Sequence, residues 1–318
     1  MSKYGMCLIV FVLMLTGAVS AETWRLGQNE KWKVVSDTQD KYMLAVAHVK
    51  KLVSEGETEA VIKALEKLKT DFPEITGSDF DVFARGEVLF SRGNLAKAVR
   101  VYEKVLTEYP ESRLYDAALD RQYSIARAFL DGQKKPMFKV FKIKGYAEGV
   151  KIMEKISDRA GDAPIAVEAS VAVSESYEKR GKYDLAYYKW SEIYTQWPTG
   201  LTGKNALLGM ARSKHASYRG PKYNAAELVS AKSYYENFKL RYSEDAKKAD
   251  IDMRLKQIEE QLAYKHYSIA RYYQQVGSKQ SANLYYQMVI DSWPQSQAAI
   301  MAKEMMNEQK KQDKKVKK

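Results

Sequence analysis

Few side chains in this sequence have the types and spacing that catalysis or metal binding would need. The three histidines lie far apart, without a His-Glu-x-x-His motif or other paired-ligand spacing: His48, His215 and His266. Residues 200–205 only superficially resemble a phosphate-binding loop, because the four-residue spacing and the Ser or Thr after the lysine are missing. Asp79 and Asp81 are typical of a helix cap rather than of a calcium loop. We therefore predict no catalytic residue, no metal site, no cofactor and no enzyme activity.

One stretch interleaves positive charge with large apolar side chains. Residues 134–144 hold five lysines among Met, Phe, Val and Ile, inside an insertion at residues 132–145. Such a stretch fits contact with a lipid surface or an acidic partner, through Phe138, Lys139 and Phe141. The alternative is an enlarged loop whose apolar residues tuck into its own helix pair, while the lysines reach outward to water.

The N-terminus has the three parts of a secretory signal: a positive Lys3, an apolar run at residues 6–14 and small residues at 19–21. We predict a signal peptide over residues 1–21, since the apolar run is short for a membrane-spanning anchor. The only cysteine, Cys7, lies inside this run, so the mature chain is expected to have no cysteine chemistry. Lipidation of Cys7 is the less favoured alternative. Export without disulfides suits a bacterial periplasm.

The positive charge of the chain is concentrated at its C-terminal end. The formal net charge is +12, and residues 310–318 alone hold six Lys and one Asp. The modest remainder argues against a nucleic-acid-binding surface. The tail is interpreted as a solvated end, with contact to anionic lipid headgroups as the alternative.

Gly, Ala and Pro recur at fixed distances along the chain. From Gly181 to Ala186 is five residues, and from Ala186 to Pro198 is twelve. The same steps occur twice more, at Gly93, Ala98 and Pro110 and at Gly277, Ala282 and Pro294. This spacing is typical of the 34-residue tetratricopeptide repeat, in which each unit is a pair of helices.

The repeat also predicts which side chains pack where the two helices of a unit cross. A small residue of the first helix faces a large one of the second in three units: Gly86 with Tyr102, Ser174 with Trp190, and Ala270 with Tyr286. A weaker unit ends at Pro73, and two irregular units cover residues 116–164 and 203–243. Apolar side chains four, three and four residues apart further predict one long helix over residues 245–275. A last helix is expected from about Ser296.

These patterns predict an all-α fold, a right-handed tetratricopeptide-repeat solenoid of about five to six helix pairs, and no stretch shows sustained strand alternation. The predicted solenoid covers residues 41–302 as a single stack. It follows an N-terminal arm at 22–40, expected to dock by its two tryptophans, and precedes a Lys-rich tail at 303–318. Regular helix is expected from near Tyr42.

Three phrases resemble one family of tetratricopeptide proteins. The first runs Leu262-Ala-Tyr-Lys-His-Tyr-Ser-Ile-Ala-Arg-Tyr-Tyr273, and with Trp293-Pro-Gln-Ser296 it is similar to the closing repeat of the BamD family. The turn Tyr218-Arg-Gly-Pro-Lys-Tyr223 and the segment 121–130 resemble earlier parts of that family. BamD proteins are lipoproteins of the outer-membrane β-barrel assembly machinery. The resemblance covers roughly residues 40–300.

The sequence departs from this family at two places. Family members carry a lipid-anchoring cysteine directly after the signal, whereas position 22 is Glu. The insertion at 132–145 is the second departure. The resemblance implies a periplasmic scaffold in peripheral contact with the inner face of the outer membrane, whose partners are the barrel-assembly subunit and nascent outer-membrane proteins. The alternative is a soluble periplasmic adaptor for other cell-envelope or division machinery.

A protein-binding groove is expected along the first helices of the units. Its candidate side chains lie on those predicted helices: Arg85, Arg121, Arg127 and Tyr177. The arginines suit pairing with carboxylates of a partner. The competing interpretation is that each is a solvated side chain or packs within the stack.

Overall fold

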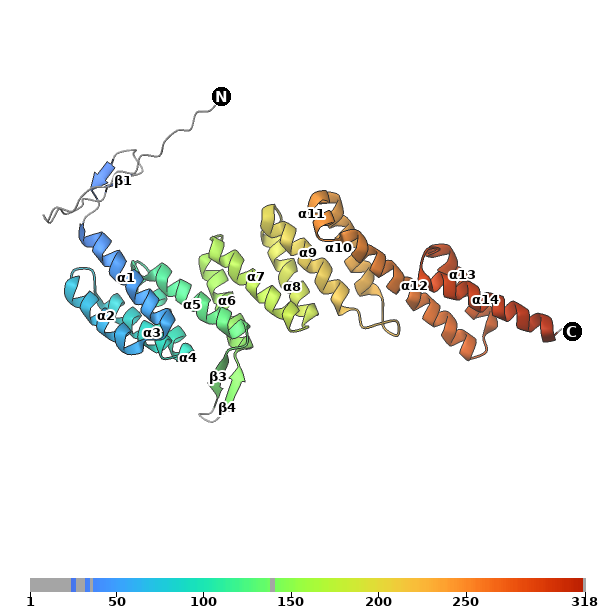
Figure 1. Ribbon diagram of the computed structural model, residues 1–318, viewed down its shortest axis with the longest axis horizontal. Coiled ribbons are helices and arrows are strands. Elements are labelled where there is room, and N and C mark those ends of the chain that lie inside the picture. Colours follow the sequence, from blue (N-terminus) through green and yellow to red (C-terminus); the bar gives the residue numbers. More distant parts are fainter. Residues whose placement is uncertain (1–23, 27–31, 35–36, 138–140, 317–318) are drawn as a thin grey trace, which may run out of the picture. The chain divides into compact units, whose positions relative to one another are not determined.

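The computed structural model describes the chain except for residues 1–23, 27–31, 35–36, 138–140 and 317–318 (Figure 1). The chain divides into two compact units, residues 1–115 and 116–318. The described residues form 14 helices and four short strands. The predicted all-α class is therefore confirmed, and the helices follow one another in pairs, as in a tetratricopeptide array.

The first compact unit, residues 1–115, contains two helix pairs preceded by a short hairpin. Its elements are β1 (Trp24–Leu26), β2 (Trp32–Val34), α1 (Asp37–Glu55), α2 (Thr58–Asp71), α3 (Ser78–Ser91) and α4 (Leu95–Glu108). The strands β1 and β2 are antiparallel, with Trp24 opposite Val34. The N-terminal arm thus has a regular hairpin that the sequence did not predict, and helix begins five residues before the expected Tyr42. The predicted docking of the two tryptophans concerns side chains outside the described part.

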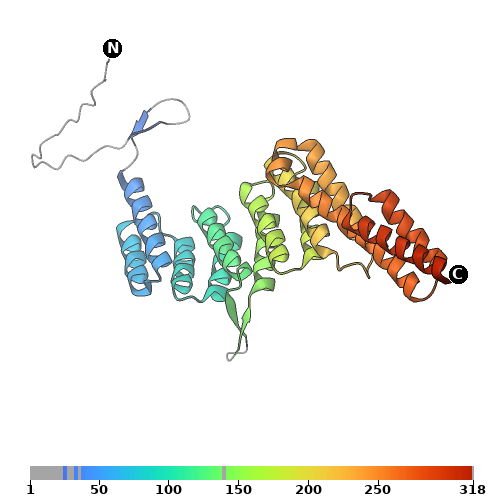
Figure 2. The same cartoon turned by 45° about the vertical axis from the view of Figure 1, so that its right-hand side comes forward.

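The second compact unit contains four further helix pairs, the short helix α11 and a closing helix. Its elements are α5 (Tyr115–Leu130), β3 (Lys134–Met137), β4 (Phe141–Lys144), α6 (Tyr146–Ala160), α7 (Pro164–Lys179), α8 (Tyr183–Gln196), α9 (Gly200–Ser217), α10 (Ala226–Arg241), α11 (Ser243–Lys248), α12 (Ile251–Gln275), α13 (Lys279–Ser292) and α14 (Gln297–Val316). Consecutive helices from α6 to α10 lie side by side in both views (Figures 1 and 2). Helix α14 packs on α12 and α13 as a cap over the last pair.

The small-against-large packing predicted from the repeat is present. The predicted small residues of the first helices, Gly86, Ser174 and Ala270, are buried, as are their large partners Tyr102, Trp190 and Tyr286, and a Cβ added at Gly86 would lie 2.5 Å from the Tyr102 ring. In the second helices Ala98, Ala186 and Ala282 are completely buried as well. The glycines that precede them adopt positive φ angles of 70°, 68° and 80° at the turns: Gly93, Gly181 and Gly277. This left-handed conformation is nearly free of strain only for glycine, so it explains why the phrase begins with that residue.

In these three repeats the large aromatic residue also donates a hydrogen bond to a side chain of the first helix. Tyr102 Oη donates to Glu87 Oε1 at 2.6 Å, and Tyr286 Oη donates to Gln274 Oε1 at 2.6 Å. Trp190 Nε1 likewise donates to Glu178 Oε1 at 3.0 Å. Aromatic burial and hydrogen bonding are therefore satisfied together, as buried polar atoms require.

Side-chain hydrogen bonds join neighbouring helix pairs. Ser91 donates to Thr58 33 residues earlier, at 3.2 Å, within the first unit. Arg212 Nη2 donates to Glu178 Oε2 34 residues earlier, at 3.0 Å, within the second. These separations are close to the repeat length of 34 residues, so each bond links one helix pair to the next.

The long helix predicted over residues 245–275 was wrong at its start. Helix α11 ends at Lys248, and α12 begins at Ile251 after Asp250, whose φ is +51°. A left-handed residue cannot continue an α-helix, and Asp is one of the few side chains that tolerates it. The apolar face itself is confirmed, since Ile251, Ile258 and Leu262 are all buried in one core. The last helix begins at Gln297, next to the expected Ser296.

The insertion at 132–145 forms a β-hairpin rather than the expected loop. Strands β3 and β4 pair antiparallel, with Lys134 opposite Lys144 and Met137 opposite Phe141. The hairpin projects away from the helices in both views (Figures 1 and 2). Gly145 joins it to α6, and its amide donates to Gln133 O at 2.9 Å. The absence of strands, expected from the sequence, was therefore wrong here.

One close crossing gives a direct test of this packing. A Cβ added at Gly209 of α9 would lie 2.4 Å from ring atoms of Trp190, whose indole is held by its bond to Glu178. We expect Gly209→Ala to lower the free energy of unfolding by about 1–3 kcal/mol, because the ring has nowhere to move. The measurement is urea unfolding followed by circular dichroism. Asn205→Ala, at an exposed position of the same helix, is the matched control and should be neutral or stabilising. Equal effects of the two substitutions would contradict this account.

Candidate protein-binding pocket

The side chains predicted to line a groove do not gather at one place. Arg85 is exposed on α3, and Arg121 is half-buried on α5. Arg127 lies 3.9 Å from Glu175 as a largely solvated ion pair, which is worth little in water. Tyr177 packs beside the core of α8 and α9, with the Arg180 guanidinium 4.8 Å from its ring centre. Their proposed role in binding stays a prediction.

The three candidate contacts of the insertion fall largely outside the described part. Phe138 and Lys139 lie in the undescribed segment 138–140. Phe141 begins β4, but its side chain is outside the described part as well. Their expected contact with a membrane or a partner therefore stays a prediction.

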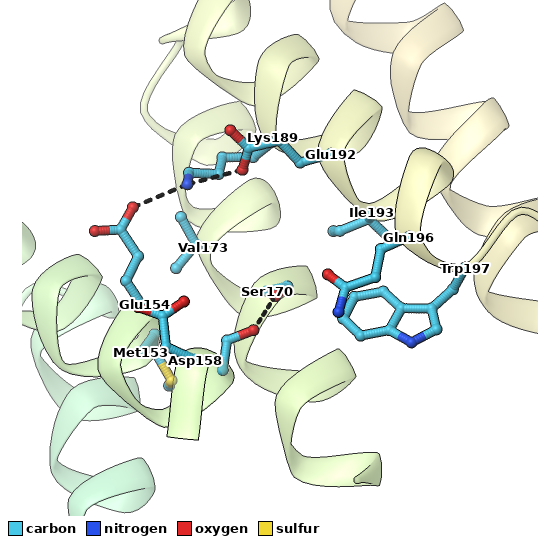
Figure 3. Close-up of a pocket in the computed structure, with 11 residues that line it drawn as sticks. Met153, Glu154, Asp158, Ser170, Val173, Lys189, Glu192, Ile193, Gln196 and Trp197 are labelled. Atoms are coloured by element: carbon cyan, nitrogen blue, oxygen red, sulfur yellow. Dashed lines mark hydrogen bonds and ion pairs between the residues drawn. The ribbon is translucent and has the colours of Figure 1, made fainter. Parts of the chain in front are cut away.

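A small pocket of about 120 Å³ lies between α6, α7 and α8 (Figure 3). Lys189 Nζ spans it, donating to Glu154 and Glu192 at 2.9 Å each. Burial acts to lower the pKa of Lys189, but its hydrogen bonds to Glu192 and Glu154 outweigh burial and raise it. Since Lys189 is bonded to a carboxylate of α6 and to one of its own helix α8, we interpret it as a structural link between helices rather than a binding group.

A larger pocket of about 520 Å³ lies where the first helices of three successive pairs meet. Glu178 of α7, Arg212 of α9 and Arg254 of α12 line it. Further lining comes from His215 at the end of α9, Tyr218 in the following turn and Tyr235 of α10. We call this the arginine pocket, and its size is typical of a ligand-binding site.

One wall of the arginine pocket is a network centred on Glu178. Its Oε1 accepts from Trp190 Nε1 at 3.0 Å and from Ser213 Oγ at 3.1 Å. Its Oε2 accepts from Arg212 Nη2 at 3.0 Å. The carboxylate is thus satisfied, and its charge is balanced by Arg212.

The opposite wall has a positive charge without such a balance. Arg254 makes a 3.5 Å hydrogen bond from Nε to Ala249 O. In the part of the chain that the structure describes, no carboxylate forms an ion pair with it. Taken together, the side chains named above carry one net positive charge, because His215 is neutral at pH 7.

Two tyrosine hydroxyls at this pocket have no hydrogen-bond partner among the described residues. They are Tyr218 Oη and Tyr235 Oη, both shielded from solvent. Tyr235 is completely buried. It stands eight residues before Ser243, just as the large aromatic residue of each regular repeat stands eight residues before the closing proline. Burial raises the pKa of Tyr235, although the nearby Arg254 and Arg212 oppose the rise. The hydroxyl therefore stays protonated and able to donate.

His215 closes the pocket as a neutral side chain. Its Nε2 lies 2.9 Å from Gln261 Oε1, and its ring meets the Tyr235 ring edge-on at 6.1 Å. Burial lowers the pKa of His215, the positive charge of Arg254 lowers it further, and the bond to Gln261 opposes both. His266 is also shifted downward, by burial and by Lys265.

Sequence reasoning missed Arg212, Tyr235 and Arg254 as members of one site. A signal was present at Tyr235. In two regular units the acceptor stands twelve residues before the large aromatic residue, Glu178 before Trp190 and Gln274 before Tyr286. The residue twelve positions before Tyr235 is Tyr223. Nothing in the local spacing indicates that Arg254 lies opposite.

Other kinds of site have no support in the described part of the chain. No group of His, Cys, Asp and Glu side chains there is arranged to hold a metal ion. None of its helices combines the length and apolar character needed to cross a membrane.

Comparison with known proteins supports the repeat assignment. Residues 83–112, from α3 through α4, match the family model of the tetratricopeptide repeat. No curated protein sequence matches the chain significantly.

Several solved structures show a distant likeness. PilW, a type IV pilus biogenesis factor, is 14% identical over 83% of this chain and 97% of its own, with a TM-score of 0.32. PilF of Pseudomonas aeruginosa is 15% identical over 86% and 100%, with a TM-score of 0.36. The C-terminal part of a repeat protein of Cytophaga hutchinsonii is 16% identical over 83% and 95%, with a TM-score of 0.37. At such values the likeness does not extend to what these proteins bind or assemble.

The unpaired Tyr235 hydroxyl predicts a contrast between two equivalent positions. Tyr286→Phe should lower the free energy of unfolding by about 1 kcal/mol, because it removes the bond to Gln274. Tyr235→Phe should leave stability unchanged or raise it, since no protein group loses a partner. Urea unfolding of the two variants beside the wild type measures both. A comparable loss in Tyr235→Phe would mean that its hydroxyl is bonded in solution.

The two lowered histidine pKa values predict a pH dependence. Between each folded-state pKa and the ordinary value of 6.5, the unfolded chain binds more protons than the folded one. The free energy of unfolding should therefore fall as the pH is lowered through 6.5. The double variant His215→Gln/His266→Gln should lose part of this slope in urea unfolding at pH values between about 7.5 and 5.5. His48→Gln, an exposed histidine, is the control. An unchanged slope in the double variant would refute the assignment.

Proposed function

We propose that this chain is a non-enzymatic scaffold that binds segments of other proteins. The observation that carries the proposal is the arginine pocket, which no single repeat forms. Helices α7, α9 and α12 belong to three successive pairs, and each contributes a charged side chain to it. Stacked repeats hold such a surface rigid, so little conformational entropy is lost when a partner binds.

The finer proposal is a role in outer-membrane β-barrel assembly, in the periplasm. What supports it is the resemblance of residues 262–273 and 293–296 to the closing repeat of the BamD family. Residues 262–273 belong to α12, the helix that also carries Arg254, and residues 293–296 form the segment between α13 and α14. The partners would be the barrel-assembly subunit and nascent outer-membrane proteins, with peripheral contact at the inner face of the outer membrane.

A second candidate is a soluble periplasmic adaptor for other envelope or division machinery. The observation that favours it is Glu22, at the position where the family carries its lipidated cysteine. Both candidates share the same binding surface and differ in the partner and in the attachment to the membrane.

Site-specific photo-crosslinking tests the proposed function. A photoreactive amino acid replaces Tyr183, which lines the arginine pocket, in intact envelopes. The matched control carries it at Tyr188 on the same helix, which is 63% exposed and does not line the pocket. We expect adducts with other envelope proteins at Tyr183 that are weak or absent at Tyr188.

The adducts also distinguish the two candidates. A barrel-assembly subunit in the Tyr183 adducts, identified by mass spectrometry, together with recovery of the chain in the membrane fraction supports barrel assembly. Adducts with division or wall proteins and a chain wholly in the soluble periplasm support the adaptor. Equal adduct patterns at Tyr183 and Tyr188, or no adducts at either, would contradict binding at this pocket.

A further inference from the structure

The arginine pocket offers more hydrogen-bond donors than the chain itself uses. Tyr235 is completely buried, and its hydroxyl has no partner among the described residues. Tyr218 lines the same pocket, and its hydroxyl is also buried without a hydrogen-bond partner among the described residues. Buried polar groups in folded proteins are nearly always paired, so two such hydroxyls in one pocket call for an explanation.

The charge of the pocket points to a single negative charge in the ligand. Glu178 already accepts from Trp190, Ser213 and Arg212, so it needs nothing further. The guanidinium of Arg254 is left without an opposite charge in the described part of the chain. One net positive charge is matched by a monoanion and not by a phosphoryl group, which carries close to two negative charges at pH 7.

The shapes of the donors also favour a carboxylate. A guanidinium presents two parallel N–H groups, which fit the two oxygens of a carboxylate. A buried tyrosine hydroxyl beside it supplies a third donor, and such bonds to a charged acceptor are stronger than neutral ones. Glu178 on the far wall sets a limit, because a ligand placed close to it would be repelled.

The position of the pocket indicates an internal acidic residue rather than a chain end. Its walls come from α7 at one side and α12 at the other, and it is open to solvent. Because the pocket is open to solvent, a bound chain is not forced to end inside it.

We propose that the arginine pocket binds the carboxylate of an Asp or Glu side chain in an extended segment of a partner protein, with Arg254 and Tyr235 as its donors. This inference rests on the proposed function, since it names the chemistry of the partner at the same pocket. Tyr218 stands as a further donor to the same carboxylate.

A peptide titration tests the chemistry directly. The probes are blocked at both ends, Ac-Ser-Ala-Glu-Ala-Ser-NH2 and the same peptide with Gln for Glu. A third probe has Gln at the centre and a free C-terminal carboxylate. NMR of the full chain follows the indole N–H of Trp190, which donates to Glu178 at the pocket wall, up to millimolar peptide. We expect saturable binding of the Glu peptide alone.

Variants of the chain then assign the donors. Arg254→Gln should weaken binding of the Glu peptide by about ten- to a hundredfold, and Tyr235→Phe by about tenfold. Arg254→Lys keeps the charge but not the paired donors, so its affinity should fall between the wild type and Arg254→Gln. The matched control is Lys256→Gln, which removes the same charge at an exposed position of α12 and should change affinity less than twofold. Circular dichroism confirms that each variant is folded.

Several results would overturn the inference. Equal binding of the Glu and Gln peptides would show that the carboxylate is not recognised, and binding of the third probe alone would show that the pocket takes a chain end. Equal losses in Arg254→Gln and Lys256→Gln would reduce the effect to general attraction by a basic protein. Tyr235→Phe with wild-type affinity would remove the hydroxyl from the site.

The outcome is separable from that of the proposed function. Photo-crosslinked adducts at Tyr183 that persist at full yield in Arg254→Gln leave the scaffold in place and refute the carboxylate. Specific binding of the Glu peptide without any adduct at Tyr183 supports the carboxylate and refutes capture of envelope proteins at this pocket.

Discussion

The fold depends on the contact between a small residue in one helix and a large aromatic residue in another. Glycine or alanine lets two helix backbones approach closely, and a Tyr or Trp ring fills the space beside the crossing. Each ring carries a polar atom, and burying that atom without a partner is costly. The regular units meet both demands at once, as Tyr102 does with Glu87 and Tyr286 with Gln274. The aromatic side chain therefore sets the distance between the two helices, and its polar atom is hydrogen-bonded within the core.

The unit formed by α9 and α10 meets only the first demand. Tyr235 fills the aromatic position and is completely buried, but the widened turn at 218–225 provides no acceptor for its hydroxyl. The next first helix brings Arg254 to the same place. The pocket thus forms where the aromatic ring is packed as in the other repeats but its hydroxyl has no acceptor. Departures of this kind are expected at functional sites.

Glu178 connects the structural and the functional parts of this unit. It holds the indole of Trp190 within its own helix pair and binds Arg212 and Ser213 of the next one. By neutralising Arg212 it also leaves Arg254 as the uncompensated charge of the pocket. A rigid scaffold whose stacking contacts also define its binding surface needs no separate device to preorganise that surface.

The sequence by itself determined the helix pairs, the turn glycines and the aromatic core positions, because these depend on spacing within one unit of about 34 residues. It did not indicate the helix break at Asp250, because no Gly or Pro marks the left-handed residue there. It did not indicate the hairpin of β3 and β4 either. Only the tertiary structure decided the arginine pocket. Its donors Tyr235 and Arg254 belong to different helix pairs, and stacking brings them together across a distance in sequence that carries no local pattern.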